Sequence, residues 1–493
     1  MLEEYGLPSD IKVPFVYFGV DNSRAGMFQN KSNILLFGQK FSGGTATPNV
    51  AVQVFGNEAD LFGYGSMLQR MCTKARRTIS AGQVWAVPFD DVGAASQWTV
   101  TITAPTTGSP ETGAIIIGGE IYRVTALITD SSDSIASKLT DLINDDPDRL
   151  VDAVAASNVI TLTARHKGET AGKIKVLTEY RRQRLSAGNI GMVVAQTVVG
   201  SGVPDISTAL AAIGDTEFNW IGQPYVDSAT ISLMSQDMDD SIGRWSAMSR
   251  LNGHVATVHD DTITNRVALT STLNDQHLSI MGLYGSPTPA YEITAELTGI
   301  LQRHLSDAPE LSRPLQTISL PLTLAPEIED VDDKESLQTL MSNGAGGFNV
   351  LRDGEVTISR VLTTYQSNAH GVPDNSYMDV QTLAQLSYTM EYLRYKLTQT
   401  YPRHSLRSDD FTPTPGTYVV TPRIITGALS IWAQQLSNQN VIEDIDGFIE
   451  RISVQRSDSD PNCLEMVIQP DLVNQFRIAK ILVQFYNQYP EAA

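Results

Sequence analysis

The stretch that decides the fold runs from His254 to Tyr284 and reads HVATVHDDTITNRVALTSTLNDQHLSIMGLY. It begins and ends with strand-like runs, residues 254–259 and 277–284, which enclose the helix-like residues 261–273. A strand, a helix and a second strand in this order predict two parallel strands with the helix packed on one face of their sheet.

The same alternation extends to both sides of this stretch. Strand-like residues 218–222 and helix-like residues 228–242 precede it, and helix-like residues 289–305 follow it. We therefore predict an α/β core, with a parallel or mixed sheet and flanking helices, over residues 201–325. Short apolar runs earlier in the chain predict buried strands, so residues 21–94 are expected to form the first part of this core.

A β-rich peripheral module is predicted to be inserted into the core at residues 95–200. Residues 98–102 alternate apolar side chains with threonine, and Gly118-Gly119 between two isoleucine-containing runs predicts a hairpin. A strand is expected at residues 159–163, and glycines at both ends of the module predict hinges. The helix between these strands is predicted to place one apolar face on the module's core, formed by Ile135, Leu139, Leu142 and Ile143.

A C-terminal α+β domain is predicted for residues 326–470. Its long helix ends before Pro402, and a second helix begins at Thr421-Pro422, where the hydroxyl can cap the first turn. A hairpin of residues 448–456 and 463–469 follows. The apolar positions of the long helix step by three and four along the chain: Leu383, Leu386, Met390, Leu393 and Leu397.

Both ends of the chain read as extended apolar arms, residues 1–20 and 471–493. Prolines prevent a regular helix in the first arm, and the sequence pattern shows no segment against which either arm would fold. We predict that the arms form inter-subunit strands; the alternative is that they fold back on their own domain. The candidate residues are Val13, Phe15, Tyr17, Ile478, Ile481, Val483 and Phe485.

Composition limits the function classes. The 493 residues carry a formal net charge of −20, which disfavours binding to nucleic acid phosphates. The best basic cluster, residues 180–184, is interpreted as a solvated loop or a salt-bridging edge. No apolar run is long enough to cross a membrane and no signal peptide is recognisable, so we expect synthesis to end in the cytosol. Cys72 and Cys463 are expected to be buried apolar residues.

An α/β core invites a search for catalytic residues. Asp215 and His254 could be two members of a catalytic triad, but no nucleophilic serine motif accompanies them. His254 and His259 lie on opposite faces of a strand, so a shared metal ion is not expected. Residues 344–347 lack the lysine of a phosphate-binding loop and are interpreted as a flexible turn.

Two groups of aspartates are likewise interpreted as solvated surface, because neither has the spacing of a calcium loop. They are Asp237, Asp239 and Asp240, and Asp330, Asp332 and Asp333. The residues therefore predict no catalytic, cofactor-binding or metal-binding site, and a protein that is not an enzyme.

Several motifs resemble those of one family. They include GEVTISR at residues 354–360, TTYQ at 363–366, PDNSYMDV at 373–380 and PDLVNQ at 470–475. Together, and in the same order along nearly the whole chain, they resemble the Mu-like contractile phage tail sheath proteins. Each motif is structural and weak alone, but the series is specific.

The resemblance implies a core of subtilisin-like fold without protease activity and without a cofactor. It implies hexameric rings that stack helically around a tail tube, linked by the terminal arms, and a contraction that drives the tube through the host envelope. It also implies tail tube, baseplate and tail terminator proteins as partners, assembly in the host cytoplasm and a final place in the virion.

Three alternatives remain at this point. The nearest is the sheath of a related contractile injection system or of a phage-tail-like bacteriocin, which works in the same way. A different virion component fits the α/β core and long arms less well. An α/β hydrolase would need a nucleophile that the sequence does not show.

Overall fold

The computed structural model describes residues 32–485 except residues 107, 413, 415 and 416. The described chain forms two compact units. The larger unit, here called the body, contains residues 32–387, 437–443 and 470–485. The smaller unit, here called the C-terminal unit, contains the remaining described residues between 388 and 469.

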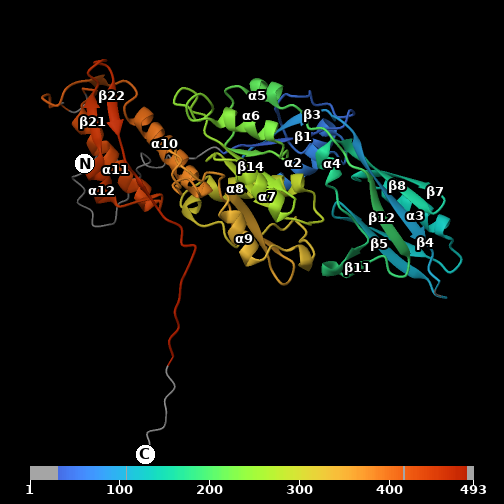
Figure 1. Ribbon diagram of the computed structural model, residues 1–493. Helices are drawn as coiled ribbons and strands as arrows, with labels where there is room; N and C mark the ends of the chain where they lie inside the picture. Colours follow the sequence, from blue (N-terminus) through green and yellow to red (C-terminus); the bar gives the residue numbers. More distant parts are fainter. Residues whose placement is uncertain (1–31, 107, 413, 415–416, 486–493) are drawn as a thin grey trace, which may run out of the picture. The chain divides into compact units, whose positions relative to one another are not determined.

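An eight-stranded mixed sheet is the largest sheet of the body (Figure 1). Its order is β17, β16, β15, β14, β13, β1, β3 and β2, with parallel pairing from β16 to β3 and antiparallel pairing of β17 and β2 at the edges. The strands are β1 (Ile34–Gln39), β2 (Val52–Gln53), β3 (Val84–Phe89), β13 (Trp220–Gly222), β14 (His254–His259), β15 (Leu278–Gly282), β16 (Ala345–Val350) and β17 (Val356–Arg360).

Helices cover both faces of this sheet, so β1, β14 and β15 are buried at every position. The helices of this part are α1 (Glu58–Phe62), α2 (Met67–Thr78), α5 (Ser207–Ile213), α6 (Ser228–Met238), α7 (Ile263–Thr270), α8 (Ala290–Leu305) and α9 (Lys334–Met341). Helix α8 is buried on all sides and packs against α2 and the central strands. The predicted α/β class with a parallel sheet is confirmed.

The sheet continues beyond residue 325, where the sequence predicts a separate C-terminal domain to begin, since β16 and β17 extend it. The interpretation of residues 344–347 as a flexible turn is wrong, because most of this run belongs to β16 and is buried. A Cβ on Gly346 would lie 2.2 Å from the sulfur of Met281. Glycine is therefore used here for close packing against β15, not for flexibility.

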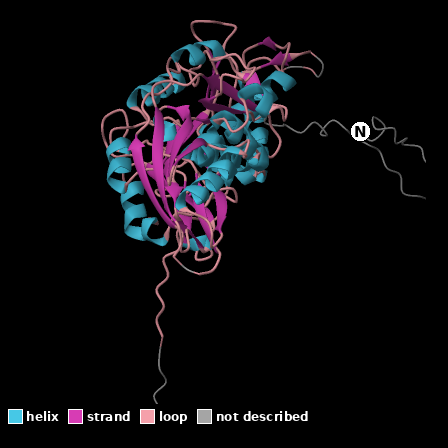
Figure 2. Ribbon diagram, turned by 90° about the vertical axis from the view of Figure 1, so that its right-hand side faces the viewer, coloured by secondary structure: helices cyan, strands magenta, loops and turns pink. Residues whose placement is uncertain are grey.

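Residues 95–198 form three antiparallel sheets, of four, three and two strands, beside α3 (Ser132–Asn144), with an apolar core of their own. Figure 2, which turns the right-hand side of Figure 1 toward the viewer, shows strands of this region side by side. The strands are β4 (Ala95–Thr103), β5 (Glu111–Ile117), β6 (Glu120–Ala126), β7 (Val151–Ala156), β8 (Val159–Lys167), β9 (Val176–Leu177), β10 (Glu179–Tyr180), β11 (Leu185–Ser186) and β12 (Gly191–Val198); a short helix, α4 (Glu169–Gly172), follows β8.

The predicted hairpin at Gly118-Gly119 is confirmed: β5 and β6 pair across these two residues, whose φ angles of 56° and 90° suit glycine. Leu142 does not share the buried face of α3 and is 43% exposed. The buried face of α3 includes Ala136, which was not predicted, instead of Leu142. The exact boundaries of the module stay a prediction.

The edge strand β7 is protected by a side chain. The amide of Asn144 donates to the carbonyl oxygen of Ala153 at 2.8 Å, and its oxygen accepts from the backbone N–H of Ala153 at 3.0 Å. These two bonds occupy backbone groups that another strand could otherwise pair with.

We expect Asn144→Ala to destabilise the protein by about 1–3 kcal/mol, because two partly buried hydrogen bonds between the side chain and the backbone are lost, and to promote aggregation through the opened edge. Urea unfolding and light scattering measure the two effects. Asn189→Ala, which removes only a surface bond to Glu111, is the control. Equal stability and equal aggregation of the two variants would contradict a protective role for Asn144.

The C-terminal unit contains the later turns of α10 (Val380–Thr400), α11 (Pro422–Asn438) and α12 (Ile445–Arg451). Its strands are β18 (Ser405–Leu406), β19 (Val419–Val420), β21 (Ser453–Arg456) and β22 (Leu464–Val467). The predicted helix start at Thr421-Pro422 is confirmed, with the Thr421 hydroxyl accepting from the N–H of Ile424 at 3.5 Å. Along α10, Met390 is 42% exposed, so the predicted apolar face is incomplete.

Two sequence predictions for this unit need correction. The first half of the predicted strand at residues 448–456 is helical, because the Asp444 side chain caps α12 by accepting from the N–H of Gly447 at 3.2 Å. Cys463 is exposed in the turn before β22, whereas Cys72 is buried as predicted. Over the described residues, no helix is both long and apolar enough to cross a membrane.

Candidate assembly interface

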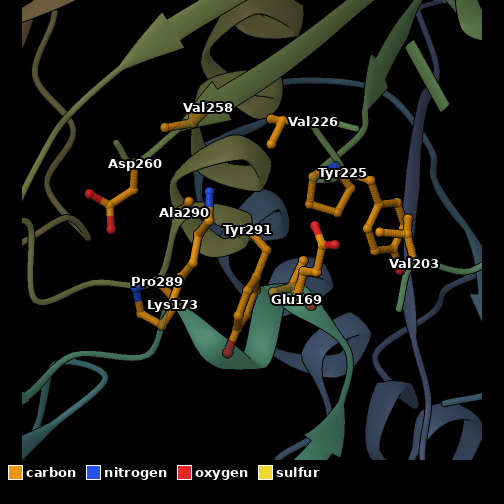
Figure 3. A pocket seen from close by; sticks show the side chains of 12 residues that line it. Glu169, Lys173, Val203, Tyr225, Val226, Val258, Asp260, Pro289, Ala290 and Tyr291 are labelled. Atoms are coloured by element: carbon orange, nitrogen blue, oxygen red, sulfur yellow. The ribbon is translucent and has the colours of Figure 1, made fainter. Parts of the chain in front are cut away.

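A pocket at the carboxyl ends of β13 and β14 lies where α/β proteins commonly bind ligands (Figure 3). Its empty space, open solvent included, is about 490 Å³. Glu169 and Lys173, which follow β8, and Tyr225, Asp260 and Tyr291, which belong to the core, are among its lining residues.

Polar groups of this pocket already bind other residues of the protein. The carboxylate of Asp260 accepts from the N–H of Gly285 at 3.0 Å and lies 3.3 Å from the Lys175 ammonium. The hydroxyl of Thr170 donates to Gln39 at 3.1 Å. Asp260 of the core is thus tied to Lys175, and Thr170 is tied to Gln39 of β1. These contacts join the core to residues 95–198, so they favour a structural junction at this place.

His254 is held inside the sheet rather than in a catalytic arrangement. Its Nε2 lies 2.8 Å from the buried hydroxyl of Ser279, and its Nδ1 has no hydrogen-bond partner among the described residues. Burial lowers the pKa of His254 to about 3, with a further contribution from His277, so the imidazole is neutral near pH 7. Asp215 is exposed and does not orient it.

His259 lies at the opposite end of β14 from His254, so the structure does not bring the two histidines together. Burial also lowers the pKa of His259, to about 4. In the described part of the chain, no group of three potential ligands is placed to hold a metal ion.

The aspartates interpreted as solvated surface include Asp332, which is bound inside the body, and Asp240, which is exposed but contacts a buried histidine. Both carboxylate oxygens of Asp332 accept from the guanidinium of Arg266, at 2.6 and 2.7 Å, and the two side chains are 8% and 1% exposed. Asp240 lies 2.8 Å from Nε2 of His277. The interpretation is therefore wrong for Asp332, because a partner 66 residues away covers its charge.

Basic residues 180–184 lie on an edge that binds the segment around residue 327. The guanidinium of Arg181 donates to Glu329 at 2.7 Å, and the Tyr180 hydroxyl donates to the carbonyl oxygen of Ala325 at 2.7 Å. The salt-bridging interpretation is the one that the structure supports.

The C-terminal extension is the most apolar exposed segment of the body. After β23 (Asp471–Leu472), residues 473–485 have no regular secondary structure and appear as a red trace in Figure 1. Its exposed side chains are Phe476 (77%), Ile478 (70%), Ile481 (81%), Leu482 (82%), Val483 (78%) and Phe485 (79%). So much apolar surface in water favours a contact with another chain.

Four of these residues, Ile478, Ile481, Val483 and Phe485, are the ones that the sequence predicts for inter-subunit strands, and their binding role stays a prediction. Phe476 and Leu482 are equally exposed and were not predicted. The N-terminal candidates Val13, Phe15 and Tyr17 lie outside the described residues. The alternative of a terminus folded back on the body fits residues 471–477, which it binds, and not residues 478–485.

A second open feature is the hairpin of β21 and β22 in the C-terminal unit. The two strands pair only with each other in the described structure, so each has one edge without a partner strand. Met466 and Val467 are 39% and 56% exposed on β22. A two-stranded sheet with exposed apolar residues is marginal alone and accepts additional strands.

The exposed apolar extension favours a protein that associates with other chains. Comparison with known proteins agrees. The phage tail sheath protein central domain matches residues 200–364, and the phage tail sheath C-terminal domain matches residues 372–486. The chain is 30% identical over 485 residues to a Mu-like prophage FluMu tail sheath protein of Haemophilus influenzae, covering 97% of this chain and 98% of the relative.

The chain therefore belongs to the phage tail sheath family, and it is a structural tail protein of a phage or phage-like contractile system. Two solved structures are distantly similar. The sheath tail protein of Listeria innocua has 12% identity and a TM-score of 0.46, covering 91% of this chain and 93% of that one. A chain of the anti-feeding prophage baseplate has 9% identity and a TM-score of 0.42, covering 97% and 99%.

Proposed function

We propose that this chain polymerises as helically stacked hexameric rings around a tail tube, and that contraction of this sheath drives the tube through the host envelope. The observation that carries the proposal is the C-terminal extension, whose apolar side chains are 70–82% exposed within the described chain. Burial of such side chains in a neighbouring subunit is a favourable driving force for assembly.

The extension is suited to strand addition. Its residues 478–485 have no regular secondary structure and no backbone hydrogen bond within the described chain, and each strand of the hairpin of β21 and β22 has one edge without a partner strand. If the extension of one subunit adds a strand to the hairpin of the next, backbone groups on both sides become paired. The N-terminal arm, residues 1–20, is proposed to link subunits in the same way.

Contacts of this kind join unlike surfaces of identical subunits, and they generate a helical polymer when their rotation does not close. The arms would tether subunits while the folded bodies pivot, so that the lattice switches without unfolding. The energy for contraction is stored in a metastable assembled state, which requires no nucleotide.

The proposed partners are other copies of the chain, the tail tube, the baseplate and the tail terminator proteins. The assembly would form in the host cytoplasm and remain in the virion. Residues 95–200 are proposed to face outward, because insertions are tolerated where few contacts connect them to the core.

Negative-stain electron microscopy of the purified chain, concentrated and followed over time, tests this function. We expect striated tubes or stacked rings, either alone or after addition of the cognate tube protein. Persistent monomers in the presence of the tube protein would overturn the proposal.

Salt is expected to promote the assembly. Each subunit has a formal net charge of −20. Salt at about 0.1–0.15 M limits the electrostatic repulsion between subunits to distances of roughly 8–10 Å. The onset concentration for polymerisation, measured by light scattering, should therefore fall as sodium chloride is raised over this range. A rise instead would show that attractive ion pairs between subunits outweigh the net charge.

A further inference from the structure

The C-terminal extension is bound to the body as far as Arg477 and is unbound after it. Leu472 pairs with Ile442, and the N–H of Val473 donates to the carbonyl oxygen of Val441 at 3.2 Å. The side-chain amide of Gln385 donates to the carbonyl oxygen of Val473 at 2.9 Å. Residues 471–477 thus form a fixed root, and the exposed residues 478–485 form a free part.

Asp379 holds the last residue of this root. Its carboxylate lies 3.1 Å from the guanidinium of Arg477, as an ion pair, and accepts hydrogen bonds from the guanidinium of Arg360 at 2.7 and 2.8 Å. Arg477 also donates to the side-chain oxygen of Gln381 at 2.9 Å. The side chains of Arg360, Asp379 and Arg477 are only 22%, 16% and 10% exposed, which strengthens these charge-assisted bonds.

The position of this cluster in the fold makes it a rigid anchor. Arg360 is the last residue of β17, Asp379 immediately precedes α10, and Gln381 lies in the first turn of that helix. The guanidinium of Arg477 therefore connects the extension to residues in or directly next to regular secondary structure. The next cation along the chain, Lys480, is exposed and lies in the free part.

We propose that Arg477, held by Asp379 and Gln381, positions the free part of the C-terminal extension for capture by a second copy of the chain. Without the anchor, the root and the free part would sample many more conformations, and ordering them on capture would cost more entropy. Arg477 is thus a positioning residue for assembly, and this inference rests on the proposed function.

The test compares Arg477→Gln with Lys480→Gln, which removes the same charge three residues later. The first readout uses monomer below the onset concentration: the rate of chymotrypsin cleavage after Phe476, divided by the rate after Phe485, which is exposed in every variant. We expect this ratio to rise about tenfold in Arg477→Gln, because charge-assisted bonds of the root are lost, and to stay unchanged in Lys480→Gln.

The second readout is the onset concentration of polymerisation. We expect an increase of about tenfold or a complete loss in Arg477→Gln, a smaller increase in Arg477→Lys, which keeps the charge but not the planar donors, and no change in Lys480→Gln. Melting temperatures of all variants should stay close to that of the wild type, which separates positioning from loss of fold.

The outcomes are distinguishable. An unchanged cleavage ratio in Arg477→Gln overturns the inference, as does a raised ratio with normal polymerisation. If the wild-type chain fails to polymerise even with the tube protein, the proposed function fails and the inference fails with it, although a raised ratio would still demonstrate the anchor.

Discussion

A chain that ends at Arg477 is expected to fold normally and to remain monomeric where the full chain polymerises. The removed residues 478–493 include exposed apolar side chains such as Ile481, Leu482 and Val483, which make no core contact. Their loss should leave the stability of the body unchanged but remove the surface proposed to bind the next subunit. Sedimentation velocity and electron microscopy measure the assembly, and circular dichroism measures the fold.

A full-length variant separates chain length from apolar character. Replacing Ile481, Val483 and Phe485 by serine keeps the extension but removes its apolar surface, and it should abolish assembly as the truncation does. Deletion of residues 1–20 is expected to have the same effect. A truncated chain that still builds normal tubes would eliminate the extension as the link between subunits.

The second large effect is expected inside the body, at Glu292 on α8. This carboxylate is 2% exposed and accepts from Nε of Arg70 at 2.5 Å and from Nζ of Lys74 at 2.8 Å. Glu292→Gln would remove the carboxylate that pairs with Lys74 and would leave Arg70 paired only with Glu120, at 2.9 Å, so we expect a loss of about 3–5 kcal/mol in the free energy of unfolding. Urea unfolding followed by tryptophan fluorescence measures this loss.

Glu329→Gln is the matched control for this substitution. Its ion pair with Arg181 is 65% and 64% exposed on the two sides, so a change within about 1 kcal/mol is expected. Equal losses in the two variants would contradict a stabilising role for the buried cluster.

The contribution of Glu292 should also depend on pH. Burial alone would raise the pKa of Glu292, but the attraction of Arg70 and Lys74 outweighs burial and lowers it below the ordinary value of 4.5. A carboxyl group with a lowered folded pKa stabilises the protein fully above its unfolded pKa and loses this effect as the pH falls through the folded value. The difference between wild type and Glu292→Gln should therefore shrink below about pH 4.5; a difference independent of pH would contradict the ion-pair account.

Sequence reasoning succeeded where structure depends on neighbouring residues. The run of β14 matches its predicted residues 254–259, the glycine pair at 118–119 forms its hairpin turn, and Thr421-Pro422 begins its helix. The family was also recognisable from motifs along the chain. Strand alternation, turn chemistry and helix capping are local properties, so a single sequence is enough to read them.

Only the tertiary structure showed which distant residues meet. The sequence predicts solvated surface at Asp332, but Arg266 lies beside it. It predicts a turn at Gly346 and Gly347, but Met281 of β15 packs against the first and Leu337 of α9 against the second. The anchor of the extension joins Arg477 to Asp379, 98 residues earlier in the numbering. Such pairs depend on which segments fold against one another. No local sequence pattern around a charged or small residue indicates which distant residue it will contact.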